Sequence, residues 1–177
     1  MFQGNVRQTK AIERAAKEDI ALSDTVKFFT DYWKSGFNPN IGRDEITARP
    51  NPPPGHRHVH ILPFNFPHTS RPGTSVTPTI NEKRWRDWAS QKKLRNEYIR
   101  KDQIPTSDAC LFYFVDTKRN AYIFHVQFEE AHAYMNSNEF NNLVEKVSYS
   151  VESSGTHLMS WHDQQELFAD KWQIQTD

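Results

Sequence analysis

The chain has 177 residues, a length that a single domain accommodates easily. Its 22 basic and 22 acidic side chains balance, so it is not a polycation as a whole, and an aromatic content of 13% compensates for a modest hydrophobic fraction of 36%. One cysteine excludes an intramolecular disulfide framework and any site that needs several cysteines. No stretch approaches about eighteen apolar residues, and the start lacks the apolar segment of a signal peptide, so we expect a soluble, cytoplasmic protein with no membrane partner.

The balanced totals conceal an uneven distribution of charge. Residues 67–101 carry nine basic and three acidic side chains, whereas residues 102–177 carry four basic and twelve acidic ones. This polarity predicts one face for an anionic partner and another for a cationic partner. A solvated helix beside an acidic tail is the alternative interpretation.

The N-terminal third of the chain is predicted to be helical. An apolar stripe at helical spacing favours a helix over residues 24–35, which Ser23 or Asp24 can cap. Gly36 fits the position that follows the last turn of this helix. Residues 5–22 favour a further helix, with a short strand near their beginning as the alternative.

The middle of the chain alternates irregular segments with one short strand. Residues 36–55 and 65–80 are too rich in Pro, Gly, Asn and Ser for regular structure. Between them, residues 58–62 suit a strand that carries Val59 and Ile61 on one face.

A hairpin and two further helices complete the prediction. Residues 110–115 and 121–128 are β-rich runs joined by a polar turn. Residues 138–151 have helical spacing, and the tail, residues 152–177, is expected to pack as an added helix. This order predicts an α+β fold, in which a small antiparallel sheet has helices packed on one face.

The common nucleotide-binding and hydrolase signatures are absent. The six glycines are scattered singly, so there is no glycine-rich phosphate loop and no Gly-x-Ser-x-Gly elbow. Cys110 falls in a predicted strand, where a small buried hydrophobe is a commoner role than a nucleophile.

His56, His58 and His60 recur at every second residue, so in a strand they share one face. A metal site would use them as neutral imidazoles and would need a carboxylate or another histidine nearby. An acid–base site would use an imidazole to move a proton near neutral pH. The third interpretation is a proline-rich loop that simply carries polar histidines, and the spacing alone does not separate the three.

Two other groups of polar residues are candidates. Arg43 and Asp44 form a charged corner, in which the carboxylate can hold the guanidinium ready for a phosphate; a structural salt bridge or an Asx-turn is the alternative. His132 follows the second strand of the hairpin, a common location for functional side chains. His125 alternates away from the hydrophobic set of that strand, and functional and structural roles are both open for it.

Four motifs follow one another in a distinctive order. The first, in residues 29–44, has the pattern Phe-x-x-Tyr-x-Lys-x-Gly-x-x-Pro-x-x-Gly-Arg-Asp. The others are the histidine strand of residues 58–62, Thr-Ser-Asp before Leu-Phe-Tyr in residues 106–113, and a strand that ends near His132 and is followed by a helix. In this order the chain, over about residues 5–151, resembles the YafO family of bacterial type II toxins. It departs from the family by a basic insertion, about residues 70–103, and by the tail.

The resemblance implies a RelE/ParE-like fold in a single toxin-like domain over residues 1–177. It implies a ribosome-dependent mRNA interferase, an endoribonuclease that inhibits translation and is neutralised by a cognate antitoxin protein. Such cleavage needs no metal or other cofactor: the ribose 2′-OH attacks the adjacent phosphorus while a base and an acid move protons. We expect His60 or His58 to transfer one proton and His132 to take the complementary role.

Further site residues follow from the same hypothesis. Arg43 would hold phosphate, oriented by Asp44, with Lys34 and Arg49 as additional electrostatic candidates. Tyr113 would stack on a base or pack in the core, and both interpretations stay open.

The basic insertion combines charge with flat rings over residues 81–100, which are predicted to be helical. We expect Trp85 and Trp88 to be buried against the domain. Four cations are expected to contact ribosomal or messenger RNA: Arg84, Lys92, Lys93 and Arg95.

Two functions from other classes remain alternatives. One is a non-catalytic RNA- or ribosome-binding module that uses residues 67–101 as its contact. The other is a metal-dependent hydrolase built on His56, His58 and His60.

Overall fold

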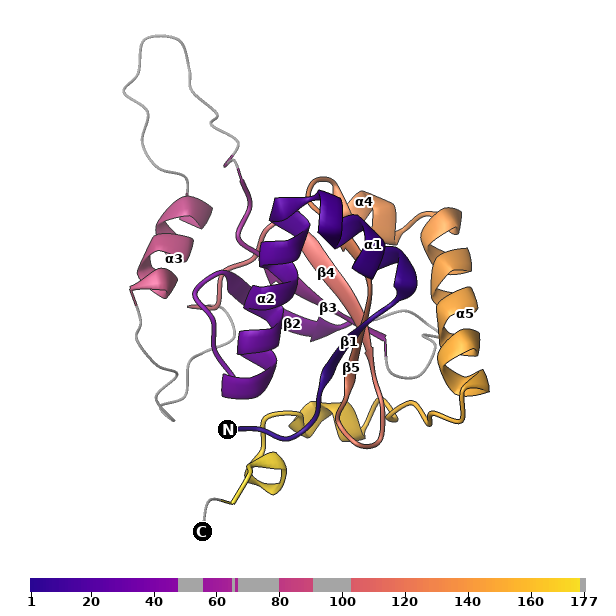
Figure 1. Cartoon of the computed structure of the whole chain (residues 1–177). Coiled ribbons are helices and arrows are strands. Elements are labelled where there is room, and N and C mark those ends of the chain that lie inside the picture. Colours follow the sequence, from indigo (N-terminus) through magenta and orange to yellow (C-terminus); the bar gives the residue numbers. More distant parts are fainter. Residues whose placement is uncertain (48–55, 65, 67–79, 91–102, 176–177) are drawn as a thin grey trace, which may run out of the picture.

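The computed structural model describes residues 1–47, 56–64, 66, 80–90 and 103–175. These residues form an α+β fold, as the sequence predicts, with a five-stranded sheet and helices around it (Figure 1). In chain order the elements are β1 (Val6–Gln8), α1 (Lys10–Glu18), α2 (Ile20–Ser35), β2 (Ile41–Ile46), β3 (His56–Ile61), α3 (Ile80–Ala89), β4 (Cys110–Val115), β5 (Ala121–Gln127), α4 (Ala131–Met135), α5 (Asn138–Ser153) and the 3₁₀ turns η2 (Asp163–Glu166) and η3 (Asp170–Trp172).

The strands follow the order β1-β5-β4-β3-β2 across the sheet. β1 runs parallel to β5 and the other three pairs are antiparallel, so the sheet is mixed and not purely antiparallel as predicted. The predicted hairpin is confirmed as β4 and β5. The histidine strand β3 lies between β4 and the edge strand β2, and hydrogen bonds on both sides fix its backbone.

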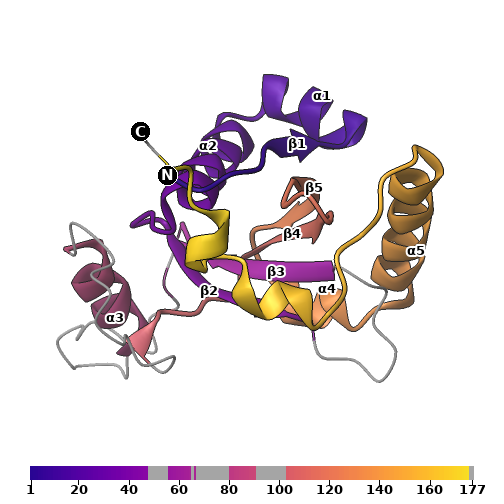
Figure 2. The same ribbon diagram turned by 90° about the horizontal axis from the view of Figure 1, so that it is seen from below.

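Helices cover both faces of the sheet, and the prediction of helices on one face is wrong (Figure 2). On one face α2 packs through Phe29 and Trp33 against Tyr113 of β4. On the other face α5 packs through Phe140 against Phe112 of the same strand, with ring centroids 4.7 Å apart. Successive residues of a strand point to opposite faces, so the continuous apolar run of β4 supplies two cores.

Capping residues at both ends determine where α2 begins and ends. The Asp19 side chain accepts a hydrogen bond from the Leu22 N–H at 3.1 Å, and the helix therefore begins at Ile20, earlier than predicted. At the other end Gly36 has a left-handed backbone with φ 81°, which confirms the predicted position after the last turn.

The strand β2 replaces part of the irregular structure predicted for residues 36–55. It pairs with β3, so that Ile41 lies opposite Ile61 and Glu45 lies opposite His58. Its sequence, IGRDEI, has little of the apolar alternation that indicates a strand, since several of its side chains contact polar partners. Glycine is required at position 42, since a Cβ there would lie 2.8 Å from the ring of Trp85.

The basic insertion contributes the helix α3. Trp85 and Trp88 are buried, as predicted, and their indole N–H groups donate to the carbonyl oxygens of Thr106 at 3.2 Å and Ile41 at 2.8 Å. Arg84 is exposed on the same helix. The rest of the predicted helix, including Lys92, Lys93 and Arg95, lies outside the described residues.

The C-terminal segment, residues 154–175, packs along the domain through two 3₁₀ turns and not as the predicted added helix. Arg119 joins it to the N-terminal segment: the buried guanidinium donates to the carbonyl oxygens of Leu167 at 2.6 Å, Trp33 at 3.0 Å and Gln3. Its burial lowers the pKa of Arg119 to about 10. Among the helices of the described residues, none has both the length and the apolar composition needed to cross a membrane.

Candidate active site

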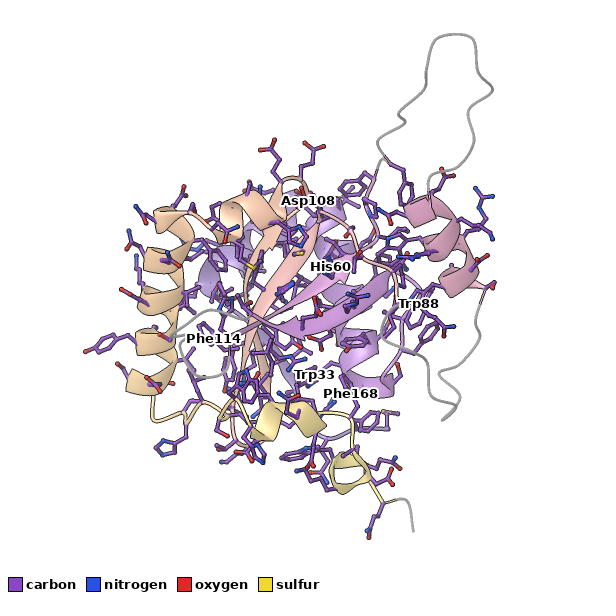
Figure 3. All side chains as sticks on the ribbon, turned by 180° about the vertical axis from the view of Figure 1, so that it is seen from behind. Trp33, His60, Trp88, Asp108, Phe114 and Phe168 are labelled. Atoms are coloured by element: carbon purple, nitrogen blue, oxygen red, sulfur yellow. The ribbon has the colours of Figure 1, made fainter. Side chains whose placement is uncertain are left out.

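Three histidines from two elements meet on the α4 face of the sheet. Figure 3 labels one of them, His60, together with Asp108. The rings of His58 and His60 on β3 have centroids 5.3 Å apart. His132, in the first turn of α4, lies 5.4 Å from His60 and 6.4 Å from His58 by the same measure. The structure thus brings together the three histidines to which the sequence assigned proton transfer.

His56 shares their face of β3 but belongs to the hydrophobic core. Its ring lies 5.3 Å from that of Phe140 and 5.7 Å from that of Phe124. The predicted metal set of His56, His58 and His60 is therefore wrong in one member.

Asp108 fixes the position of His132. One carboxylate oxygen, Oδ1, accepts a hydrogen bond from the His132 backbone N–H at 3.0 Å and lies 2.6 Å from the ring Nδ1. Because the ring places its Nδ1–H on the carboxylate, the other nitrogen, Nε2, is the one available for chemistry. About half of each side chain is exposed, 49% for His132 and 57% for Asp108, so the pair is accessible from solvent. Burial alone would raise the pKa of Asp108, but the hydrogen bonds from His132 outweigh it and lower that pKa below its usual value.

The loop before β4 fixes the ring of His60. Its Nδ1 lies 2.7 Å from the Ser107 carbonyl oxygen and 3.2 Å from the Ser107 nitrogen, and the shorter contact assigns the proton to Nδ1. Nε2 then carries the lone pair and lies 4.0 Å from Oε2 of Glu45. Burial lowers the pKa of His60, and the hydrogen bond to Ser107 offsets this only in part, so the neutral ring can accept a proton.

His58 is the second buried imidazole of the group, and it lines the larger hollow. Its Nδ1 is 3.1 Å from the hydroxyl oxygen of Thr47. Burial, followed by the proximity of His60, lowers the pKa of His58 to about 4. This ring is therefore neutral under physiological conditions and is a poor proton donor.

Cys110 closes the group at the start of β4. Its sulfur lies 3.6 Å from Nδ1 of His60, and the side chain is buried as predicted. Burial raises the pKa of the Cys110 thiol well above its usual range, so the group stays protonated at neutral pH and is not a nucleophile in this state.

Two hollows adjoin this group, and His132 lines both of them. One, of about 700 Å³, is lined by residues of β2, β3, α4 and the C-terminal segment, including Glu45 and Trp161. The other, of about 620 Å³, lies on the side of Ser107 and Asp108 and includes Glu129. The exposed imidazole therefore stands where two solvent-accessible spaces meet.

Asp44 takes part in a buried cluster of its own and also lines the larger hollow together with His58 and His132, whereas Tyr113 packs in the core, one of the two interpretations left open for it. Asp44 accepts from Arg57 Nε at 3.0 Å and from the hydroxyls of Tyr32 at 2.9 Å and Tyr113 at 2.7 Å. The Asp44 carboxylate is thus bonded to Arg57 and two tyrosines. Tyr113 is fully buried against α2 and cannot stack on a base.

The polar cluster of Arg57, Asp44, Tyr32 and Tyr113 packs against α2, and its members Asp44 and Arg57 also line the larger hollow. Burial and the Asp44 carboxylate raise the pKa of both tyrosines well above their usual value. Burial opposes the charge on Arg57, but the adjacent Asp44 raises its pKa overall, so the buried ion pair is retained.

The other predicted cations have separate outcomes. Arg43 shares the face of β2 that carries Glu45, and its charge is among the causes, after burial, that lower the pKa of His60. Lys34 lies in the last turn of α2, where its ammonium donates to the Gly4 carbonyl oxygen, so the structure does not bring it to the histidines. Arg49 lies outside the described residues.

The sequence prediction missed Asp108, Glu45 and Ser107 as members of the site. One feature of the sequence could have indicated Asp108 as a site residue, namely its place in the Thr-Ser-Asp motif before β4. Its contact with His132 spans 24 positions and depends on how α4 folds back over β4.

Comparisons with known proteins found no match for this chain. No protein-family model matches the chain, and no curated protein or solved structure shows significant similarity to it.

Proposed function

We propose that the protein is a metal-independent endoribonuclease that cuts mRNA on the ribosome and so inhibits translation, in the manner of a type II toxin. The observation that carries the proposal is the pair of His60 and His132. Their ring centroids are 5.4 Å apart, His132 is half-exposed and His60 is buried, and each has its Nδ1 beside a protein oxygen, which leaves Nε2 for proton transfer. Two imidazoles in this state can complete an in-line attack by a ribose hydroxyl.

In the proposed reaction the buried His60 is the base. Its Nε2 takes the proton of the ribose 2′-OH, and the oxygen attacks the adjacent phosphorus to form a 2′,3′-cyclic phosphate. The bond from phosphorus to the 5′-oxygen breaks, and His132 Nε2 gives its proton to that leaving oxygen. The carboxylate of Asp108, 2.6 Å from Nδ1, compensates the positive charge that His132 carries before this transfer.

The residues around the two histidines favour an RNA substrate that another particle holds in position. Trp161 is 55% exposed on the wall of the larger hollow and offers a flat ring for a base. Glu129 and Glu130 are exposed beside α4 and would repel a free RNA strand. Cleavage by this site therefore requires an mRNA that the ribosome positions, with the exposed cations of α3 as candidate ribosome contacts.

Primer extension on a reporter mRNA in a translating bacterial extract tests the proposal. Wild type should produce defined breaks, and His60→Gln or His132→Gln should reduce them on the order of 10²–10⁴-fold. The exposed His157, changed to Gln, is the matched control and should cut like wild type. Undiminished cleavage by both site variants, with thermal unfolding near that of wild type, would refute the assignment. An mRNA left intact by wild type would favour the non-catalytic binding module.

A toxin of this kind requires an inhibitor, and the proposal includes a cognate antitoxin protein. A segment of the antitoxin that covers the histidine group or displaces α4 would suffice to stop cleavage. Co-expression with each neighbouring small reading frame should relieve growth arrest for one of them. Arrest that persists with every neighbouring frame would count against the toxin interpretation.

A further inference from the structure

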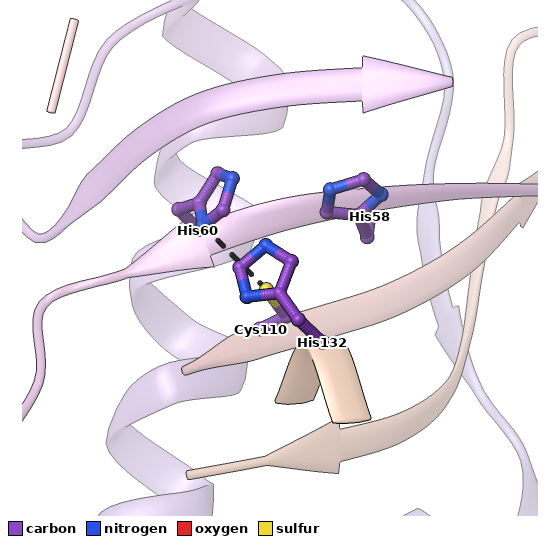
Figure 4. A group of neighbouring side chains, drawn as sticks. All are labelled: His58, His60, Cys110 and His132. Atoms are coloured by element: carbon purple, nitrogen blue, oxygen red, sulfur yellow. Dashed lines mark hydrogen bonds between the residues drawn. The ribbon is translucent and has the colours of Figure 1, made fainter. Parts of the chain in front are cut away.

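We propose that His58, His60, Cys110 and His132 form a binding site for one zinc ion, and that zinc bound there inhibits the proposed ribonuclease. Each of the four residues offers one ligand atom, and these atoms all lie within 4.8 Å of one another. Figure 4 shows the four side chains converging from β3, β4 and α4. The first half of the proposal concerns binding alone, and the second half rests on the function proposed above.

The spacing of the four atoms is close to that of an occupied site. Zinc bonds of about 2.0–2.1 Å to nitrogen and about 2.3 Å to sulfur put tetrahedral ligand atoms about 3.3–3.8 Å apart. The Cys110 sulfur already lies 3.6 Å from Nδ1 of His60, and zinc binding through that nitrogen would move the ring proton to Nε2 and replace the contact with the Ser107 carbonyl oxygen. To reach these distances the ligand atoms must move closer together. His132 is the member most easily moved, because it is exposed and lies on a short helix.

The chemistry of the donor set favours zinc over magnesium or calcium. Three imidazoles and one thiolate are borderline or soft ligands, whereas magnesium and calcium prefer oxygen. Binding replaces the S–H bond of Cys110 by a sulfur–zinc bond and releases one proton to solvent. The thiolate formed in this way is stabilised by the ion.

Groups behind the ligands already hold two of the rings as a metal site requires. Asp108 Oδ1 is 2.6 Å from Nδ1 of His132, and the Thr47 hydroxyl oxygen is 3.1 Å from Nδ1 of His58. A carboxylate or hydroxyl on the far nitrogen orients the ring and leaves Nε2 for the ion. In both cases the orientation is present in the protein by itself.

The protein also offers an entry path. His58, His60 and Cys110 are buried, but His132 lines both hollows and links the group to solvent. Asp108, Glu129 and Glu130 on the wall of the smaller hollow attract a divalent cation toward it.

Inhibition follows from the overlap of the two roles. Zinc on Nε2 of His132 prevents that nitrogen from donating a proton, and zinc on Nδ1 of His60 leaves the ring proton on Nε2, which then cannot accept one. Zinc would therefore remove His60 and His132 from proton transfer together.

Cobalt substitution tests the site without reference to RNA. Wild-type protein treated with chelator and dialysed should bind one Co²⁺, and likewise one Zn²⁺, per chain. The Co²⁺ form should show the visible bands of a tetrahedral ion and a sulfur-to-cobalt charge-transfer band. Cys110→Ser should lose the charge-transfer band, and the exposed-residue variant His132→Gln should weaken Zn²⁺ binding about tenfold or more. His157→Gln should bind both metals like wild type. No binding by wild type, or a charge-transfer band that survives in Cys110→Ser, would overturn the site.

Cleavage measured with and without zinc tests whether zinc inhibits the proposed ribonuclease. One equivalent of zinc should reduce wild-type cleavage about tenfold or more, and chelator should restore it. The cleavage rate of Cys110→Ser with zinc is compared with the rate of the same variant without metal. This variant should need about tenfold more zinc than wild type for the same fractional loss of cleavage. Zinc that binds but leaves cleavage unchanged would refute the inhibition, and zinc that raises cleavage would identify a metal-dependent hydrolase instead. Should wild type cut no RNA at all, the proposed function and the inhibition that rests on it both fail, while the cobalt measurement still decides the binding site.

Discussion

Asp108 and His132 are joined twice, because one carboxylate oxygen lies 3.0 Å from the backbone nitrogen and 2.6 Å from the ring nitrogen of the same residue. The first contact caps the beginning of α4, and the second orients the imidazole. A single side chain thus couples the start of a helix to the direction of its functional group.

Replacing Asp108 by Asn should separate these two contributions. The amide oxygen can still accept from the backbone N–H, but it no longer compensates a charged ring. We expect cleavage to fall on the order of 10²-fold, with the free energy of unfolding changed by less than about 1 kcal/mol since the pair is exposed. Cleavage rates measured beside urea unfolding check both halves. A fully active Asp108→Asn variant would show that the carboxylate does not assist His132.

The buried pair of Asp44 and Arg57 should contribute to stability and not to catalysis. Asp44→Asn leaves the Arg57 guanidinium, 3.0 Å away, without its anion in the core. The free energy of unfolding should fall by about 3–5 kcal/mol. Glu13→Gln, which breaks the exposed contact with Lys17 at 3.9 Å, is the control and should cost less than about 0.5 kcal/mol. A stable Asp44→Asn variant that no longer cuts RNA would return Asp44 to the site.

The two tyrosines bonded to Asp44 predict a loss of stability at alkaline pH. Burial and the Asp44 carboxylate raise the pKa of Tyr32 and Tyr113 in the folded state. Above about pH 10 the unfolded chain loses protons that the folded chain keeps, so their contribution to stability is complete below that pH and declines above it. Each tyrosine should lower the free energy of unfolding by about 1.4 kcal/mol per pH unit in that range.

Urea unfolding between pH 9 and pH 11 measures this slope. Tyr113→Phe should make it shallower by the contribution of one tyrosine. Tyr149→Phe, which changes a ring that is 75% exposed, is the control and should leave the slope as it is in wild type. Equal slopes in wild type and Tyr113→Phe would disprove the shift for Tyr113.

The basic insertion should bind the ribosome through its cations. Reversing Lys92, Lys93 and Arg95 to Glu should weaken ribosome association and reduce its logarithmic salt slope, by somewhat less than about one unit for each phosphate that is no longer neutralised. The matched control reverses Lys10, Arg14 and Lys17, which are exposed on α1. If both triple variants bind ribosomes alike, the insertion does not bind RNA and a protein partner becomes the better explanation.

The sequence predicted those elements whose signal is local. The hairpin of β4 and β5 was predicted correctly because its two runs are apolar and β-rich, and α2 was predicted because its apolar stripe is long. The polar strand β2 was missed, since a run such as IGRDEI becomes a strand only when β3 supplies its hydrogen bonds and Arg57 supplies the partner of Asp44.

The candidate site was predictable in part for the same reason. Alternation along β3 placed His58 and His60 on one face, as the structure confirms. Whether His56 or His132 joins them depends on the packing of α4 and α5 over the sheet, which no local pattern records. The role of Asp108 and the convergence of Cys110 on the histidines depend on that same packing.

The ends of the RNA products test the central claim most directly. Ribosome-bound mRNA should be cut by wild type in the presence of a zinc-selective chelator that leaves magnesium bound to the ribosome, once with an ordinary ribose and once with a 2′-deoxyribose at the cleaved position. Proton transfer between His60 and His132 predicts a 2′,3′-cyclic phosphate on the upstream fragment and no cut at the deoxy position. A cut at the deoxy position that leaves a 3′-hydroxyl and a 5′-phosphate would contradict the account, because attack by water and not by the ribose hydroxyl gives those ends.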